Sequence, residues 1–528
     1  MKDLPEENLD QLTDDQLLDR LAEETKAALG RVYSLHPATS IDSVTLPGGV
    51  PLSLKREDIS TVHSYKWRGS GNKISKICDA GFRGQLVAAS AGNHAQGVAV
   101  VAARQKLNAT IFMPLSTPLL KQESVRTFGG DFVTIRLFGD SFDESQREAI
   151  RFAQESGGTF IPPYDDLDVI AGQATIAVEL LDQLPELPTH VFIGIGGGGV
   201  AAGIASVIKQ RHPDIQIIGV EGAGQDSMSR SIEAGELVTL ETLDKFCDGT
   251  AVACPGKLPL RLCSMLLDDC MRVSNDDACH AIQFLWQTMR VIVEPSAGLG
   301  VAAAMATKFE PGDRPLAILS GSNVDFMMLP RIARMGQTQR PETRYYQFEI
   351  SEKAGSLIQL LDRFFVNMNI IDFQYGRMSD DIAYPTIGVE VPHSALADLE
   401  EFLNDASVPP FLEVTGSAAS NFRVIPFRVD RLKLPFFAVI EFANRPGALR
   451  EFMREASKLA NVCYMNYTDT GQTEGQALMG FDFTDIARQT EFLDWLRGSE
   501  ILFQPVPIHS VQQLTSGVES SDQWKSNP

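Results

Sequence analysis

The chain has 528 residues, of which 44% are hydrophobic and 22% are charged, as in globular proteins that bury a core. This length corresponds to about three domains of common size. The net charge of −22 argues against a nucleic acid or an anionic membrane surface as a partner, because both would repel an acidic protein.

The N-terminal segment is acidic and amphipathic. Leucines recur at helical spacing from Leu9 to Leu21, which predicts an amphipathic helix over residues 8–30. The segment lacks the apolar core of a signal peptide and the arginine-rich character of a transit peptide. No apolar run reaches the ~18 residues that are needed to cross a membrane, so we expect a cytoplasmic protein.

A lysine lies between two aromatic residues in the segment HSYKWRG, residues 63–69. An amine in an apolar pocket can lose its proton and become a nucleophile, and Lys66 is a candidate for that role. The alternative is a solvated lysine on a surface strand, because lysines are seldom buried without a partner. The neighbouring motifs must decide between these two interpretations.

Apolar runs alternate with helical patterns from about residue 85 to residue 325. The predicted strands are QLVAAS, NATIFMP, DFVTIRL, THVFIGIG, IQIIGVEG and PLAILSG, and the predicted helices include HAQGVAVVAARQ and LLKQESVRTFG. This alternation predicts a parallel sheet that is covered on both faces. Ligands of such sheets bind at the carboxyl ends of the strands, so the loops after these strands are the candidate sites.

Four consecutive glycines, residues 196–199, separate a predicted strand from a predicted helix. Their backbone N–H groups are unshielded at the helix N-terminus, and together with the helix dipole they favour a bound phosphate. No GK[ST] sequence follows, so this is not a loop for nucleoside triphosphates.

The same loop permits a dinucleotide interpretation. Gly194, Gly196 and Gly199 satisfy the GxGxxG pattern, and Glu221 ends the next predicted strand, where an acid would hold a ribose. An NAD-linked oxidoreductase is therefore an alternative, although GxGxxG alone is a weak signal and several predicted strands precede it here. A tight turn without a ligand is a further alternative, against which the chain entropy of four glycines argues.

Three other loops carry small polar residues. Residues 90–94 and 320–323 each follow a predicted strand, and Glu294 and Ser296 precede a predicted helix. A dinucleotide site needs neither these loops nor Lys66. A lysine Schiff base with a phosphorylated aldehyde cofactor needs an amine, a phosphate cradle and hydrogen-bond partners for the ring, and the sequence offers all three.

Seven cysteines are present, five of them between residues 247 and 279. None forms a CxxC pair, and the spacings do not match structural zinc sites, so we expect buried, reduced thiols and no metal.

The last third of the chain contains an internal repeat. Residues 348–375 align without a gap with residues 440–467, at an offset of 92, so that Gly355 matches Gly447 and Tyr375 matches Tyr467. Each copy predicts a strand, a glycine turn, a helix and a second strand. The helix N-terminus after the glycine suits the carboxylate of a small molecule; two packing domains without a ligand are the alternative.

Seven motifs together resemble one enzyme family. They are LKRED (54–58), HSYKWRG (63–69), ASAGNHAQGVA (89–99), VIAGQAT (169–175), GGGGVAAG (196–203), VEPSAG (293–298) and LSGSNV (319–324). In order and spacing they resemble the biosynthetic L-threonine dehydratases, also called threonine ammonia-lyases, which use pyridoxal 5′-phosphate and have the tryptophan-synthase-β fold. The resemblance extends from about residue 28 to residue 508.

The resemblance implies an α/β fold with separate catalytic and regulatory parts. Residues 1–338 would form a pyridoxal-phosphate fold-type II catalytic domain, built from two open parallel-sheet α/β subdomains. Residues 339–431 and 432–510 would form two α+β ACT-like regulatory domains, and residues 511–528 a polar tail.

The resemblance also implies roles for individual residues. Lys66 would form the Schiff base with the cofactor, Asn93 would bind the 3′-oxygen of its ring, and Ser320 would meet the ring nitrogen. The phosphate would be bound by the backbone of Gly196, Gly197, Gly198, Gly199 and Val200. The substrate carboxylate would be bound by the loop of Ser90, Ala91, Gly92, Asn93 and His94. The regulatory effector would be bound near Gly355, Tyr375, Gly447 and Tyr467.

The implied reaction is the dehydration and deamination of L-threonine to 2-oxobutanoate and ammonia, with feedback by isoleucine in a homotetramer. Alternatives are a dehydratase or racemase for serine or another β-hydroxy amino acid, and a non-catalytic amino-acid sensor. The family usually has leucine where this chain has Trp67, and this indole either narrows the pocket or packs outward.

Overall fold

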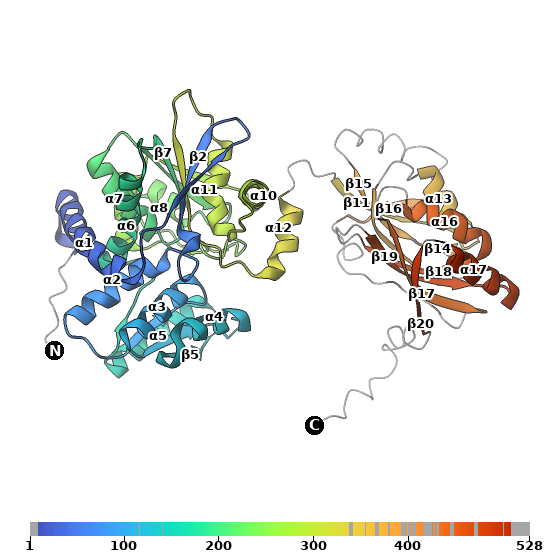
Figure 1. Cartoon of the computed structure of the whole chain (residues 1–528), viewed down its shortest axis with the longest axis horizontal. Coiled ribbons are helices and arrows are strands. Elements are labelled where there is room, and N and C mark those ends of the chain that lie inside the picture. Colours follow the sequence, from blue (N-terminus) through green and yellow to red (C-terminus); the bar gives the residue numbers. More distant parts are fainter. Residues whose placement is uncertain are drawn as a thin grey trace. The chain divides into compact units, whose positions relative to one another are not determined.

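The computed structural model describes most of the chain. The described residues are 9–336 without 116 and 140, and then 342–353, 355–364, 369–377, 381–391, 399, 403, 408–415, 425, 428, 432–443, 448–468, 474–499 and 501–507. Gly447 and the predicted tail 511–528 lie outside the described residues. The chain divides into two compact units, residues 1–338 and residues 339–528 (Figure 1).

Two sheets form the first unit. The larger has the order β1 (Ile41–Thr45), β2 (Pro51–Arg56), β10 (Pro315–Leu319), β7 (His190–Gly194), β8 (Gln216–Gly222) and β9 (Asp269–Val273). Its strands are parallel except for the antiparallel pair β1–β2. The smaller sheet is wholly parallel, with the order β5 (Val133–Leu137), β4 (Ala109–Met113), β3 (Leu86–Ala89) and β6 (Thr159–Phe160).

Helices cover these sheets (Figure 1). They are α1 (Asp14–Leu35), α2 (Lys66–Asp79), α3 (Asn93–Gln105), α4 (Leu119–Gly129), α5 (Phe142–Ser156), α6 (Leu167–Gln183), α7 (Gly199–Arg211), α8 (Ser227–Ala234), α9 (Lys257–Leu266), α10 (Asn275–Met289), α11 (Pro295–Ala306) and α12 (Leu329–Met335), with the short 3-10 helices η1 (Leu9–Gln11), η2 (Glu57–Ile59), η3 (Gly130–Phe132) and η4 (Phe326–Met328). The α/β class and the two parallel sheets that the sequence predicts are confirmed.

The burial of the central strands explains why their sequences are easily recognised as strands. Every residue of β3, β4 and β10 is buried, so these strands have continuous apolar runs rather than alternating ones, as parallel sheets covered on both faces do. The N-terminal helix differs from its predicted range of 8–30. It begins at Asp14 because Thr13 and Gln16 form a capping box, and it ends at Leu35, two residues before Pro37.

One antiparallel sheet dominates the second unit. Its order is β16 (Phe411–Glu413), β11 (Glu342–Phe348), β15 (Thr386–Val391), β13 (Asn369–Gly376), β18 (Asn461–Thr468), β19 (Glu474–Asp482), β17 (Pro435–Ala443) and β20 (Leu502–Val506). The small pair β12 (Ile350–Ser351) and β14 (Ile382–Ala383) and the helices α13 (Ser356–Phe364), α16 (Ala448–Leu459) and α17 (Ile486–Gly498) complete its described part.

The strand order of this sheet reflects the internal repeat. At the central β13–β18 pair, Gln374 lies opposite Asn466, and 466 − 374 equals the repeat offset of 92. Tyr375 lies opposite Met465, and Phe373 lies opposite Tyr467. Residues on either side of this pair are therefore related by a pseudo-two-fold axis, and each repeat contributes four strands in the same order outward from the axis.

None of the helices in the described part of the chain has both the length and the apolarity that crossing a bilayer requires.

Candidate active site

Lys66 is the first residue of α2 and lies at the carboxyl end of β10. The loop that follows β10 fixes the segment before the helix: the Tyr65 N–H donates to the Ser320 carbonyl at 3.1 Å, and the Ser322 N–H donates to the His63 carbonyl at 2.9 Å. The Lys66 amine lies 5.1 Å from the centre of the Tyr65 ring. The structure thus brings the predicted lysine and the predicted Ser320 loop together.

Trp67 packs away from this edge. Its side chain is buried in an apolar cluster with Val32, Leu35 and Ile74, and its ring lies 5.2 Å from the ring of His36. The structure supports neither interpretation as stated, because the indole neither lies in the pocket nor packs outward but is buried in the core.

The four glycines follow β7, the neighbour of β10 in the sheet, and lead into α7. Gly198 has a φ of +90°, which favours glycine. A Cβ atom on Gly197 would lie 2.3 Å from the Tyr164 ring, and one on Gly196 would lie 2.9 Å from the backbone of Thr250. Only a backbone without side chains fits here, so the N–H groups at the start of α7 form the cradle that a phosphate needs.

Asn93, the first residue of α3, joins the two sheets at this edge. Its Nδ2 donates to both carboxylate oxygens of Glu294 at 3.0 Å, and its Oδ1 accepts from Asn323 Nδ2 at 2.8 Å. Burial raises the pKa of Glu294 to about 7, against the opposing hydrogen bond from Asn93. The sequence pointed to Glu294 only as a polar residue before a helix; its contact with Asn93 was missed.

The Ser90–His94 loop connects β3 to α3. Ser90 Oγ accepts from the Gly92 N–H at 3.2 Å, and the residues from Ser90 to Asn93 are half-buried at the helix N-terminus. His94 is buried, and its Nε2 lies 2.9 Å from the Ile161 carbonyl oxygen. Burial lowers the pKa of His94 to about 4, with a smaller contribution from the Lys66 charge, so its imidazole is neutral near pH 7.

A buried group of charges holds the first turn of α2. Arg68 is fully buried; its Nε lies 2.8 Å from Glu57 Oε2 and its Nη1 lies 2.6 Å from Glu179 Oε1. The amine of Lys55 is 2.7 Å from Glu179 Oε2. Lys55 and Glu57 belong to the LKRED motif, but the sequence alone did not indicate that Glu57 pairs with Arg68 or that Lys55 pairs with Glu179.

The dinucleotide alternative is not supported by the geometry of Glu221. This carboxylate accepts hydrogen bonds from the N–H groups of Met228 and Ser229 at 2.9 and 2.8 Å, and so holds the start of α8. All seven cysteines are free thiols, and five of them are buried. Within the described residues, no group of three His, Cys, Asp or Glu side chains is placed to hold a metal ion.

These side chains and backbone groups fit pyridoxal phosphate. Lys66 provides an amine, the glycine loop on the adjacent strand provides a phosphate cradle, and Asn93 provides an amide for the ring. Ser64 Oγ and Ser296 Oγ are buried without a hydrogen-bond partner, which leaves polar atoms available at the same edge of the sheet.

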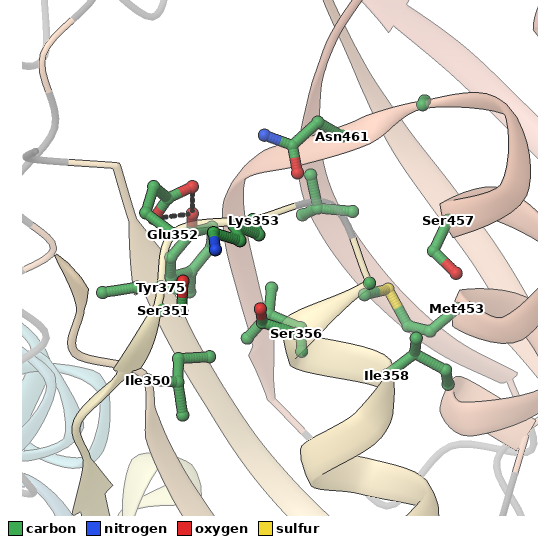
Figure 2. Close-up of a pocket in the computed structure, with 15 residues that line it drawn as sticks. Ile350, Ser351, Glu352, Lys353, Ser356, Ile358, Tyr375, Met453, Ser457 and Asn461 are labelled. Carbon is green, nitrogen blue, oxygen red and sulfur yellow. Dashed lines mark hydrogen bonds between the residues drawn. The ribbon is translucent and has the colours of Figure 1, made fainter. Parts of the chain in front are cut away.

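The second unit contains a pocket whose empty space, including adjoining open solvent, is about 330 Å³. It lies between the turn around Gly355 in the first repeat and the junction of α16 with β18 in the second (Figure 2). The Tyr375 hydroxyl donates to the buried carboxylate of Glu352, with oxygen–oxygen distances of 2.6 and 2.7 Å. Burial, and then this carboxylate, raise the pKa of Tyr375.

The four predicted regulatory residues do not all meet in this pocket. Gly355, with a φ of +91°, and Tyr375 line it. Tyr467 is buried on β18 opposite Phe373 and is not part of the lining, and Gly447 lies outside the described residues. Glu352 was not predicted; the sequence signal for it would have been its place three residues before the turn glycine.

The comparisons with known proteins agree with this geometry. Residues 37–321 match the family model of pyridoxal-phosphate dependent enzymes, and residues 432–506 match that of the C-terminal regulatory domain of threonine dehydratase. The threonine dehydratase of Nicotiana attenuata is 36% identical over 461 residues, which cover 85% of this chain and 76% of that protein.

A bacterial relative and a solved structure extend the likeness. The biosynthetic L-threonine dehydratase of Haemophilus influenzae is 34% identical over 469 residues, which cover 86% of this chain and 88% of that protein. The solved structure of the processed threonine deaminase isoform 2 from Solanum lycopersicum has a TM-score of 0.56 at 37% identity, and the match covers 60% of this chain and 93% of that one. The chain therefore belongs to the pyridoxal-phosphate-dependent enzymes and, among them, to the threonine dehydratase family.

Proposed function

We propose that this enzyme converts L-threonine to 2-oxobutanoate and ammonia as a step of isoleucine biosynthesis. The main support is the placement of the Lys66 amine at the carboxyl end of β10, held by the Ser320 loop and beside the strand that leads into the glycine cradle. The names of the relatives in Nicotiana attenuata and Haemophilus influenzae point to the same reaction.

The residues divide the work between binding and proton transfer. Pyridoxal phosphate, when bound, supplies an electrophilic aldehyde and a ring that withdraws electrons from the substrate Cα. The N–H groups from Gly196 to Val200 would bind its phosphate, with help from the dipole of α7. Asn93 would hold the ring by its oxygen, and Ser320 would hold it by its nitrogen. Lys66 would hold the cofactor through its aldehyde carbon, and its free amine would take the proton from the substrate Cα.

The Ser90–His94 loop suits the substrate carboxylate. Ser90, Ala91, Gly92 and Asn93 present polar atoms at the N-terminus of α3, where the helix dipole favours an anion. His94, anchored to the Ile161 carbonyl, keeps the loop in place. A neutral imidazole there adds no charge that would compete with Lys66 for the carboxylate.

We assign the effector, isoleucine, to the pocket of the second unit, on the strength of the charged and apolar residues that line it. The Glu352 carboxylate, which has the Arg377 guanidinium 3.8 Å away, complements an ammonium group, and Lys353 and the N-terminus of α13 complement a carboxylate (Figure 2). Ile350, Met453 and Val462 provide an apolar wall for a branched side chain. A cytoplasmic homotetramer remains a prediction from the resemblance.

The function is tested with Lys66→Ala. The wild-type protein loaded with pyridoxal phosphate is expected to show a visible absorption band that changes when L-threonine is added, while 2-oxobutanoate accumulates. Lys66→Ala should lose both signals, because it removes the amine that would hold the cofactor, whereas Lys26→Ala, at an exposed position of α1, should keep both.

Two other results would redirect the proposal. Pyruvate from L-serine without turnover of threonine would make serine the substrate, and D-serine from L-serine would indicate a racemase. A Lys66→Ala protein that still forms 2-oxobutanoate at the wild-type rate would contradict the role of the lysine.

A further inference from the structure

The carboxyl group of Glu294 is buried beside the cofactor site without serving its own helix. Glu294 is the N-cap residue of α11, yet its side chain accepts no hydrogen bond from that helix. It reaches instead to Asn93, 201 positions away in sequence, at the start of α3. The Glu294 carboxyl group, at the start of α11 on the larger sheet, therefore holds the side-chain amide of Asn93, at the start of α3 on the smaller sheet.

A chain of hydrogen bonds fixes which way the Asn93 amide points. The Val62 carbonyl oxygen can only accept, so Asn323 must place its Nδ2 there, at 2.8 Å. The same Nδ2 lies 2.8 Å from Asn93 Oδ1, which makes that atom the acceptor. Asn93 Nδ2 is then left as a donor and meets Glu294. The orientation of the amide follows from these contacts and not from an arbitrary choice of rotamer.

Two glycines leave just enough space for the Glu294 carboxyl group. A Cβ atom on Gly321 would lie 2.9 Å from its Oε1, and one on Gly249 would lie 3.0 Å from it. The charged groups that face it are Lys66 and Asp248, and the Asp248 carboxylate also pairs with Lys121 at 2.5 Å. The site is thus built around a carboxyl group of this length and shape.

We propose that Glu294 is a positioning residue for the cofactor. It holds Asn93 Nδ2 so that the second N–H of this amide would face the ring oxygen. Its carboxyl group also carries an exchangeable proton, which only the Asn93 amide separates from that oxygen. The ionised form accepts from Asn93 with both oxygens. The protonated form has one acceptor fewer and can itself donate. Each form therefore places a different charge behind the amide that contacts the ring.

This role predicts a pH-dependent signal that does not require turnover. Since the pKa of Glu294 is raised to about 7, the change of form falls near neutral pH. The visible absorption band of the protein loaded with pyridoxal phosphate should shift across this range. Glu294→Gln keeps the volume and one acceptor for Asn93 but does not titrate, so it should remove the shift.

The affinity for the cofactor provides a second readout. Glu294→Ala leaves the Asn93 amide without its charged partner, and this should weaken binding of pyridoxal phosphate to the apoprotein by about ten- to a hundredfold. Glu221→Gln is the matched control, because Glu221 is equally buried in the same unit but holds α8. The control should keep the wild-type affinity and the wild-type shift.

The proposal rests on cofactor binding and not on the identity of the substrate, so a protein that binds pyridoxal phosphate but ignores threonine still tests it. A Glu294→Gln protein whose absorption band shifts at the wild-type pH would overturn it. So would a Glu294→Ala protein that binds the cofactor as tightly as the wild type. If Glu294→Ala does not fold, the isosteric Glu294→Gln decides, with its absorption band as the measurement.

Discussion

His94 illustrates how one buried side chain makes stability depend on pH. Its folded pKa is about 4, lowered mainly by burial, whereas histidine in an unfolded chain titrates near ~6.5. Between these values the unfolded chain binds more protons than the folded chain does. The free energy of unfolding should therefore fall as the pH drops from ~6.5 towards ~4, by on the order of 3 kcal/mol for this residue.

Urea unfolding of the apoprotein at pH 7, 6 and 5 measures this effect. His94→Gln should flatten the decline, because glutamine does not gain a proton. His63→Asn is the control, since His63 is exposed and asparagine tolerates its positive φ of 55°. An equally steep decline in wild type and His94→Gln would show that other groups cause it.

Residue-scale prediction from the sequence succeeded where the signal is local. Lys66 stands out by its aromatic neighbours, and the four glycines stand out as a run, so both were found without a structure. The Asn93–Glu294 contact spans 201 positions, and nothing in the sequence near either residue indicates its partner. The same holds for Arg68, whose carboxylate partners lie on η2 and α6.

At the element scale, the position of α2 depends on its buried ion pairs. Arg68 connects the first turn of this helix, which begins with Lys66, to Glu57 on η2 and Glu179 on α6. Removing the guanidinium leaves two buried carboxylates with only Lys55 as a cation. Arg68→Met should lower the free energy of unfolding by about 3–5 kcal/mol, because an uncompensated buried charge is costly.

Urea unfolding with a second variant separates this effect from a general loss of charge. Arg151→Met removes an arginine that also contacts two glutamates, but on the exposed face of α5, where solvent screens the pair. Its unfolding midpoint should stay close to that of the wild type. If Arg68→Met were as stable as Arg151→Met, the network would not hold α2.

Element types were easier to predict than element ends. The predicted helix LLKQESVRTFG coincides with α4, because an apolar periodicity and a terminal glycine mark both its ends. The predicted N-terminal helix was shifted, because leucine periodicity continues through η1 and hides the break at Thr13. The helix begins where the side chains of Thr13 and Gln16 cap it, and an apolar pattern contains no information about polar capping residues.

At the scale of the whole chain, the repeat at an offset of 92 predicted a duplicated unit, and its strands form one sheet around a pseudo-two-fold axis. The sequence could not show that the repeats share a sheet, because the pairing of β13 with β18 involves strands from different copies. It also could not show that the pocket beside Tyr375 takes residues from both repeats. The symmetry is broken chemically: Glu352 of the first repeat corresponds to Asn444 in the second.

This difference leads to a prediction for the effector. Isoleucine should bind the full-length enzyme and lower its activity at subsaturating threonine, with the effector's ammonium group at Glu352. Glu352→Gln removes the charge that the ammonium group meets and should weaken binding of isoleucine, measured by calorimetry, by about ten- to a hundredfold. Because binding and inhibition are linked, the isoleucine concentration that gives half-maximal inhibition should rise as binding weakens.

Glu349→Gln is the control: Glu349 also accepts from a tyrosine, Tyr384, but at an exposed position of the same unit. Equal affinity of isoleucine for the wild type and Glu352→Gln would place the effector elsewhere, and an enzyme that ignores isoleucine altogether would leave the repeats a purely structural role.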